Sequence, residues 1–258
     1  MSQLGNSVSD TLVLAKRNLQ RIPRQPDLLT GYTIQPVMFT LLFVYVFGGA
    51  IATPGYDDYV DFLIPGIVVQ TIAFGGFTTA LGLSDDLRKG LIDRFRSLPM
   101  SRGAVLAGRT FSDVFLNSIS LVIMFGVGLL VGFSFLSSPG EVALGLFLML
   151  LFGYAFSWVF ALVGLNSSSP ETANALGFIA IFPLTFASSI FVPTATMPSW
   201  LEAFANVNPF STVSDAARAL FVGAPHGDDV WGAFAWAIGI TIVFAFLSIS
   251  RYRRAVSN

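Results

Sequence analysis

The sequence has no cysteine, one histidine and only two lysines among its 258 residues. Without cysteine, disulfide bonds, thiolate catalysis and cysteine metal sites are excluded. The single histidine, His226, excludes motifs that need two histidine ligands, and a lone histidine in a loop is usually a solvated residue. Neither lysine precedes serine or threonine, so the phosphate-binding loop GxxxxGK[ST] is excluded as well. If this chain moves a solute with ATP, another chain must bind the nucleotide.

Charged residues are also absent from six long stretches, and most residues in each stretch are apolar. An α-helix rises about 1.5 Å per residue, so about 20 residues cross a hydrocarbon core of about 30 Å. Each stretch is long enough for one crossing and is continuously apolar, which favours helices over a β-barrel. The sequence therefore predicts an all-α membrane protein with six transmembrane helices in a single domain, residues 1–258. The stretches are residues 28–56, 62–84, 114–140, 142–170, 172–201 and 230–250.

The basic residues indicate the orientation of these spans. All 14 except Arg218 lie in the N-terminal tail, in the 85–109 loop or at the C-terminal end. Basic residues in short loops stay on the cytoplasmic side of the membrane. The 54–61 loop, which falls on the opposite side, carries three aspartates and no base. We therefore predict a multi-pass protein with both termini in the cytoplasm.

Residues 8–22 place apolar side chains at alternating spacings of four and three, with basic residues on other faces. This spacing is typical of an amphipathic helix lying along the inner membrane surface, which Pro23 would end. A soluble tail with the same spacing is the alternative. The apolar positions are Val8, Leu12, Ala15, Leu19 and Ile22.

Residues 84–98 form the most informative polar segment. Ser84 is a candidate N-cap, followed by acidic residues in the first turn, and Asp85 and Lys89 can pair at i,i+4. Pro99 would end this short helix. Two interpretations remain open: an inner loop packed on the bilayer surface, and a docking helix that receives force from a cytoplasmic partner. The apolar stripe consists of Leu87, Leu91, Phe95 and Leu98.

Arg109, Asp113 and Asn117 are spaced four residues apart and share one face near the inner end of the third span. Charged residues at such positions normally face protein or water rather than lipid. One interpretation is a structural ion pair in which Arg109 extends to the interface. The other is an inner gate, or a relay from the 84–98 helix into the bundle.

The segment 193–229 is predicted to form short helices on the outer side. Ser199 and Glu202 fit a capping box, and Trp200 stands where aromatic side chains anchor to a membrane interface. A second helix follows Pro209, from about residue 211 to 221, in which Asp215 and Arg218 can pair at i,i+3. Both helices are too short to cross the membrane, so re-entrant or interfacial helices are expected. A folded outer loop without a gating role is the alternative.

Four segments resemble one transporter family in the same order along the chain. The sequence DLRKGLIDRFRSLPMSR at 86–102 resembles the signature loop of type-2 ABC exporter permeases, in the branch named for daunorubicin resistance. The other three are FVYVFGGAI at 43–51, FPLTFASSIFVPTATMPSWL at 182–201 and NPFSTVSDAARAL at 208–220. The resemblance runs from about residue 12 to residue 254.

The resemblance implies an elbow helix at 8–22, a coupling helix at 84–98 and outer re-entrant helices within 193–229. It also implies two permease subunits, identical or related, joined to two ATPase subunits in a bacterial plasma membrane. This chain would bind no cofactor and catalyse no reaction, because ATP and Mg²⁺ would sit in the partner. A second, smaller ATPase contact would fall near 166–174. The residues expected to contact the ATPase are Leu87, Arg88, Lys89, Leu91, Ile92, Arg94, Phe95, Arg96, Leu98 and Pro99.

The expected function is therefore export of a hydrophobic or amphipathic cargo, such as a drug, natural product or lipid. An ATP-independent channel is the main alternative, although no filter-like motif or charged ring is visible. A membrane-embedded enzyme would need a catalytic cluster inside the bundle, and an assembly scaffold would bind the partner without moving cargo. The residues do not name the cargo, the side from which it enters or the composition of the dimer.

Overall fold

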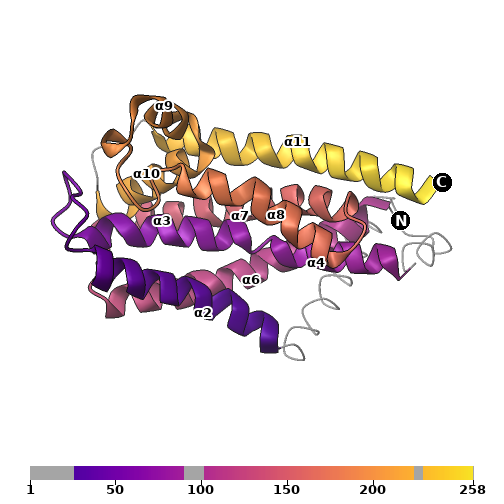
Figure 1. Cartoon of the computed structure of the whole chain (residues 1–258), viewed down its shortest axis with the longest axis horizontal. Helices are drawn as coiled ribbons and strands as arrows, with labels where there is room; N and C mark the ends of the chain where they lie inside the picture. The colour runs from indigo at the N-terminus through magenta and orange to yellow at the C-terminus, as the bar shows by residue number, and fades with distance from the viewer. Residues whose placement is uncertain (1–25, 90–101, 224–228, 258) are drawn as a thin grey trace.

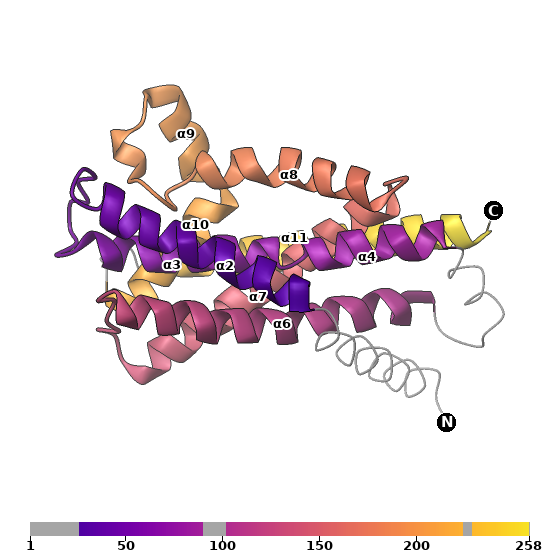
Figure 2. The same cartoon turned by 60° about the horizontal axis from the view of Figure 1, so that its bottom comes forward.

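The computed structural model describes residues 26–89, 102–223 and 229–257, and every regular element in these ranges is a helix (Figure 1). The long helices run roughly parallel along an elongated bundle (Figures 1 and 2). The elements are α2 (Pro26–Leu42), the π-helix η2 (Phe43–Phe47), α3 (Tyr59–Phe74), α4 (Phe77–Arg88), α6 (Arg102–Leu130), α7 (Pro139–Leu165), α8 (Pro170–Phe186), the 3₁₀ helix η3 (Thr194–Thr196), α9 (Ser199–Val207), α10 (Pro209–Val222) and α11 (Asp229–Ser257).

Four helical stretches are long and apolar enough to cross a membrane: Tyr59–Arg88, Leu106–Leu130, Pro139–Leu165 and Val230–Arg254. The first consists of two helices, α3 and α4, separated only by Gly75 and Gly76. A shorter apolar helix covers Ile34–Phe47. The chain is thus an all-α, multi-pass membrane protein, as the charge-free stretches predicted.

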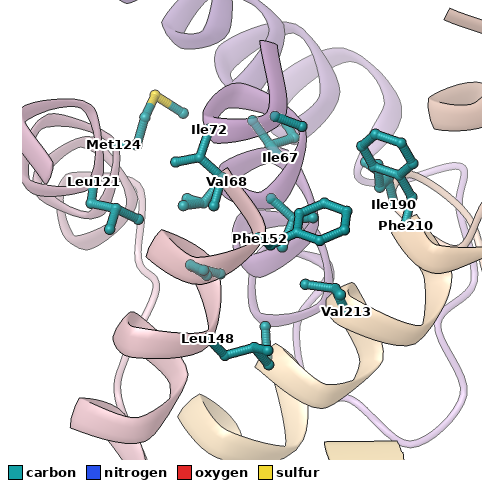
Figure 3. Close-up of a cluster of buried hydrophobic side chains, with 14 of the residues drawn as sticks. Ile67, Val68, Ile72, Leu121, Met124, Leu148, Phe152, Ile190, Phe210 and Val213 are labelled. Atoms are coloured by element: carbon teal, nitrogen blue, oxygen red, sulfur yellow. The ribbon is translucent and has the colours of Figure 1, made fainter. Parts of the chain in front are cut away.

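The core lies where α3, α6, α7 and α10 meet. Figure 3 shows their apolar side chains converging around Phe152 of α7, which has no exposed surface. Helix α3 is enclosed on almost all sides, because α2, α6, α7 and α10 all pack against it. The labelled side chains are Ile67, Val68, Ile72, Leu121, Met124, Leu148, Phe152, Ile190, Phe210 and Val213.

Helices α2 and α8 lie at the periphery of the bundle (Figure 2). In α8 only every fourth residue is buried, namely Ala173, Gly177, Ile181 and Thr185. Most large apolar side chains between them are exposed, with Ile179 at 71%. Apolar surface of this kind suits lipid tails or another membrane subunit.

Two predicted helix starts differ from the observed ones. Ser84 is not an N-cap: α4 begins at Phe77, so Ser84 lies inside that helix, where it is 1% exposed. Pro198 occupies the N-cap position of α9, and no side chain caps this helix, so the predicted capping box of Ser199 and Glu202 is wrong. Both errors arose because serine followed by acidic residues also occurs inside helices. The predicted interfacial helix at 8–22 and residues 90–98 of the predicted coupling helix lie outside the described residues.

A capping box does occur at the start of α7, where Pro139 takes the first helical position. Ser138 Oγ accepts the Glu141 N–H, and Glu141 Oε2 accepts the Ser138 N–H at 2.9 Å. Replacing Ser138 with Ala should lower the free energy of unfolding by about 1 kcal/mol, because an N-terminal donor of α7 loses its partner. Thermal unfolding in detergent measures this loss. Ser199→Ala is the matched control and should leave the midpoint unchanged; equal losses would contradict the observed caps.

Candidate functional site

Three groups of residues singled out from the sequence lie along the bundle. One end, here called the α4 end, contains the last turn of α4, the turn between α7 and α8 and the last turns of α11 (Figure 2). The opposite end, here called the α9 end, contains the 48–58 loop, α9 and α10 (Figure 1). The third group lies on the buried face of α6, between the ends.

At the α4 end, Arg88 and Lys89 are exposed and both pair with Asp85, at 3.2 and 2.5 Å. The predicted i,i+4 pair of Asp85 and Lys89 is therefore confirmed. Leu87 is half-buried and packs against a small apolar cluster that joins α4, α6, α7 and α11. The remaining predicted contact residues lie outside the described part of the chain: Leu91, Ile92, Arg94, Phe95, Arg96, Leu98 and Pro99.

The turn between α7 and α8 is fixed by its own side chains. Asn166 Nδ2 donates to the Leu162 carbonyl at 2.8 Å, and Ser169 Oγ accepts the Thr172 N–H at the start of α8. Asn166 Oδ1 in turn accepts a hydrogen bond from the Nε–H of Arg251 in α11 at 2.9 Å. The turn that was expected to form a second ATPase contact is thus linked to α11.

The three polar residues of α6 share one face, as predicted from their spacing, and this face is turned towards the protein interior. Asp113 and Asn117 are 3% and 1% exposed. Arg109 pairs with Asp86 of α4, with 2.8 Å between Nη1 and Oδ2, rather than with Asp113. Asp113 instead accepts the hydroxyl of Thr79 at 2.6 Å and lies 3.0 Å from Thr78 Oγ1.

Glycines make room for these polar side chains. A Cβ at Gly82 would overlap the guanidinium of Arg109, and a Cβ at Gly75 would overlap the amide of Asn117. On the other side of Asn117, a Cβ at Gly153 of α7 would stand 2.6 Å from Nδ2. Sequence reasoning missed these partners. The available signal was that Thr78, Gly82 and Asp86 repeat at the same four-residue spacing as the polar face of α6.

At the α9 end, Arg218 of α10 is fully buried, and its predicted pairing with Asp215 is confirmed at 2.5 Å. Its Nε donates to the Phe62 carbonyl of α3 at 2.7 Å, and its guanidinium carbon lies 3.7 Å from the centre of the Phe62 ring. Its Nη2 donates to the carbonyls of Ser189 and Ile190, at 2.7 and 3.2 Å. One side chain thus joins α10, α3 and the segment that follows α8.

Four carbonyls of the non-helical segment 187–191 accept hydrogen bonds from side chains of other elements. Asn208 Nδ2 donates to the carbonyls of Leu184 and Ala187, at 2.7 and 2.8 Å, and Tyr59 Oη donates to the Phe191 carbonyl at 2.9 Å. Irregular backbone is tolerated at membrane depth only where protein or a water-filled cavity surrounds it. The observed bonding therefore suits a chain that re-enters the membrane region.

The two short helices predicted within 193–229 are both observed, as α9 and α10. Helix α10 spans Pro209–Val222 around the predicted 211–221. In α9, Trp200 is 73% exposed and Glu202 is half-buried. Within the described ranges, no group of three or more His, Asp or Glu side chains is placed to hold a metal ion.

Comparisons of the sequence with known proteins identify its family. The model of the ABC-2 type transporter family matches residues 9–222. The daunorubicin resistance ABC transporter permease protein DrrB1 of Streptomyces coeruleorubidus is 35% identical over 96% of this chain and 87% of its own length. The probable doxorubicin resistance ABC transporter permease protein DrrC of Mycobacterium tuberculosis is 23% identical, over 97% of this chain and 91% of its own length. The putative transport permease ycf38 of Cyanophora paradoxa is 29% identical, over 83% of this chain and 74% of its own length. The extent of the family match and the 35% identity over nearly the whole chain show that this protein belongs to the ABC-2 type transporter family.

Proposed function

We propose that this chain is the membrane-spanning permease subunit of an ATP-driven exporter, and that it moves a hydrophobic or amphipathic cargo out of a bacterial cell. The observation that carries the proposal is the similarity to a daunorubicin resistance permease over 96% of the chain. Energy would come from ATP and Mg²⁺ bound by a separate ATPase subunit. This chain would work in a complex of two permeases, identical or related, and two ATPases.

Six spans are part of the proposal. The helix pair α2–η2 and helix α8 would supply two crossings beside the four long stretches, because both are apolar and both lie parallel to the bundle (Figure 2). With six spans, the α4 end and the last turns of α11 face the same side. That side carries Arg88, Lys89 and Arg251, so the distribution of bases assigns it to the cytoplasm, with both chain termini.

The ATPase would dock on the segment that α4 leads into. Leu87, Arg88 and Lys89 of the expected contact set lie at the end of α4, and the other expected contact residues follow between 91 and 99. The turn between α7 and α8, which begins the predicted contact 166–174, lies at the same end of the bundle and would form the smaller contact with the ATPase. At the opposite end, α9, α10 and the segment 187–191 would close the cargo path towards the outside.

The test of this function is copurification with the ATPase encoded beside the gene, followed by ATP hydrolysis in lipid nanodiscs. Replacing Leu91 and Phe95 together with Asp should release the ATPase, because two apolar contacts become charged. We expect at least a tenfold loss of retained ATPase, with the helices still inserted, since each apolar side chain buried at an interface is worth about 1.5–3 kcal/mol.

The matched control is Leu136→Asp, an exposed apolar residue in the loop between α6 and α7 at the α9 end. It should leave ATPase retention unchanged. Full retention by the Leu91/Phe95 variant would rule out the docking segment. A chain that binds no ATPase and conducts ions alone in a bilayer would instead support a channel.

A further inference from the structure

The polar face of α6 meets α4 in antiparallel order along almost the whole of α4. Arg109 pairs with Asp86 near the end of α4, and Asp113 binds Thr79 seven residues earlier. Asn117 lies against Gly75, just before α4 begins. The contacts thus run from the junction before α4 to near its end. The pairs Arg109–Asp86 and Asp113–Thr79 are here called the clasp.

These contacts are costly to separate. Asp113 is 3% exposed, and the side chains of Arg109 and Asp86 are 18% and 17% exposed. A buried polar group that loses its partner retains its full desolvation penalty, because no water replaces the lost bond. Sliding α4 along α6 would also move the Arg109 guanidinium out of the space beside Gly82. The two helices are thus held in one register.

The junction between α3 and α4 is built differently. The Gly75 N–H is shared between the carbonyls of Thr71 and Ile72, and the Gly76 N–H bonds three residues back to Ala73. A tightened turn of this kind inside a long helix often marks a hinge. Its two residues are glycines, which adapt their backbone angles readily. Beside it, Nδ2 of Asn117 is buried and has no hydrogen-bond partner among the described residues.

We propose that Arg109 and Asp113 are positioning residues that fasten α4 to α6, so that both helices move as one lever about Gly75 and Gly76. The lever would be driven from the chain segment that joins α4 to α6, where the ATPase is proposed to dock. The inference thus rests on the proposed function. It differs from an inner gate, in which Asp113 would release Thr78 and Thr79 during each cycle.

The absence of cysteine from the chain makes a direct test possible. In the complex with its ATPase, Thr79→Cys and Asp113→Cys would form a pair inside the clasp. Arg88→Cys and Glu171→Cys, joined by a flexible bismaleimide, would report the distance from the far end of α4 to α8. Each pair is cross-linked in nucleotide-free complex and in complex trapped with ATP and vanadate.

The lever predicts equal cross-linking of the 79/113 pair in both states and a changed yield for the 88/171 pair. Loss of the 79/113 cross-link in the trapped complex would overturn the lever in favour of the gate. An unchanged 88/171 yield would overturn it too, because α4 would then not move.

A second set of variants covers the case in which the 79/113 pair does not fold. Asp86→Arg alone places two cations together and should lower ATP-driven hydrolysis at least tenfold while the ATPase remains bound. Adding Arg109→Asp restores the pair with reversed charges and should recover most of that loss. No recovery in a folded, ATPase-bound complex would contradict the clasp. If the wild-type chain binds no ATPase, the proposed function fails and not the lever alone.

Discussion

Replacing Arg218 with Leu is expected to give the largest loss of stability of any single substitution considered for this chain, about 3–5 kcal/mol. The substitution leaves the Asp215 carboxylate without its cation and removes the donor from the buried carbonyls of Phe62, Ser189 and Ile190. Thermal unfolding of the purified protein in detergent measures the loss. Limited proteolysis at the α9 end should show that the segment after α8 opens first.

Two companion variants test the cause. Arg218→Lys keeps the positive charge but replaces the planar guanidinium with a single ammonium group. This variant should therefore lose less stability than Arg218→Leu. The double variant Arg218→Leu, Asp215→Leu should also lose less than the single one, because no uncompensated charge stays behind. A double variant as unstable as Arg218→Leu alone would show that the carbonyl bonds, and not the ion pair, dominate.

Replacing Gly164 with Ala should cause the second large effect, a loss of about 1–3 kcal/mol. A Cβ at Gly164 of α7 would stand 2.6 Å from the carbonyl oxygen and 2.9 Å from the Cα of Ala80 in α4. Both atoms belong to the backbone, so the two helices would have to separate. The midpoint of thermal unfolding in detergent measures the loss.

Gly239→Ala in α11 is the matched control, because nothing lies within 4 Å of a Cβ at that position. Alanine favours a helix by about 1 kcal/mol over glycine, so this control should keep or raise the midpoint. Equal midpoints for the two variants would mean that α4 and α7 are not in close contact at this crossing.

Much of the architecture can be predicted from the stretches that lack charged residues, because a sufficiently long apolar stretch forms a helix in a hydrocarbon core. The ends of helices are harder to foresee. The charge-free stretch 172–201 continues to the start of α9, yet α8 stops at Phe186, since bonds from Asn208 and Arg218 hold the next residues out of the helix. Those bonds come from side chains more than twenty residues away, which no local pattern contains.

The candidate site, too, was predicted only in part. The spacing of Arg109, Asp113 and Asn117 correctly placed them on one face, because helical geometry alone decides which residues share a face. Their partners depend on which helix packs there. Asp86 was interpreted as part of a cytoplasmic helix start, and it is instead the counter-ion of Arg109 near the end of α4. Only the packing of α4 on α6 reveals that.

The bonding of segment 187–191 has a consequence for the order in which the protein is made. The carbonyls of Ser189 and Ile190 are bonded by Arg218, which leaves the ribosome 29 and 28 residues after them. Until α10 has been synthesised and docked, these carbonyls have water as their only partner. We expect the newly made segment to stay hydrated at the membrane surface while the earlier helices insert. The α9 end should therefore be the last part of this membrane domain to mature during biogenesis.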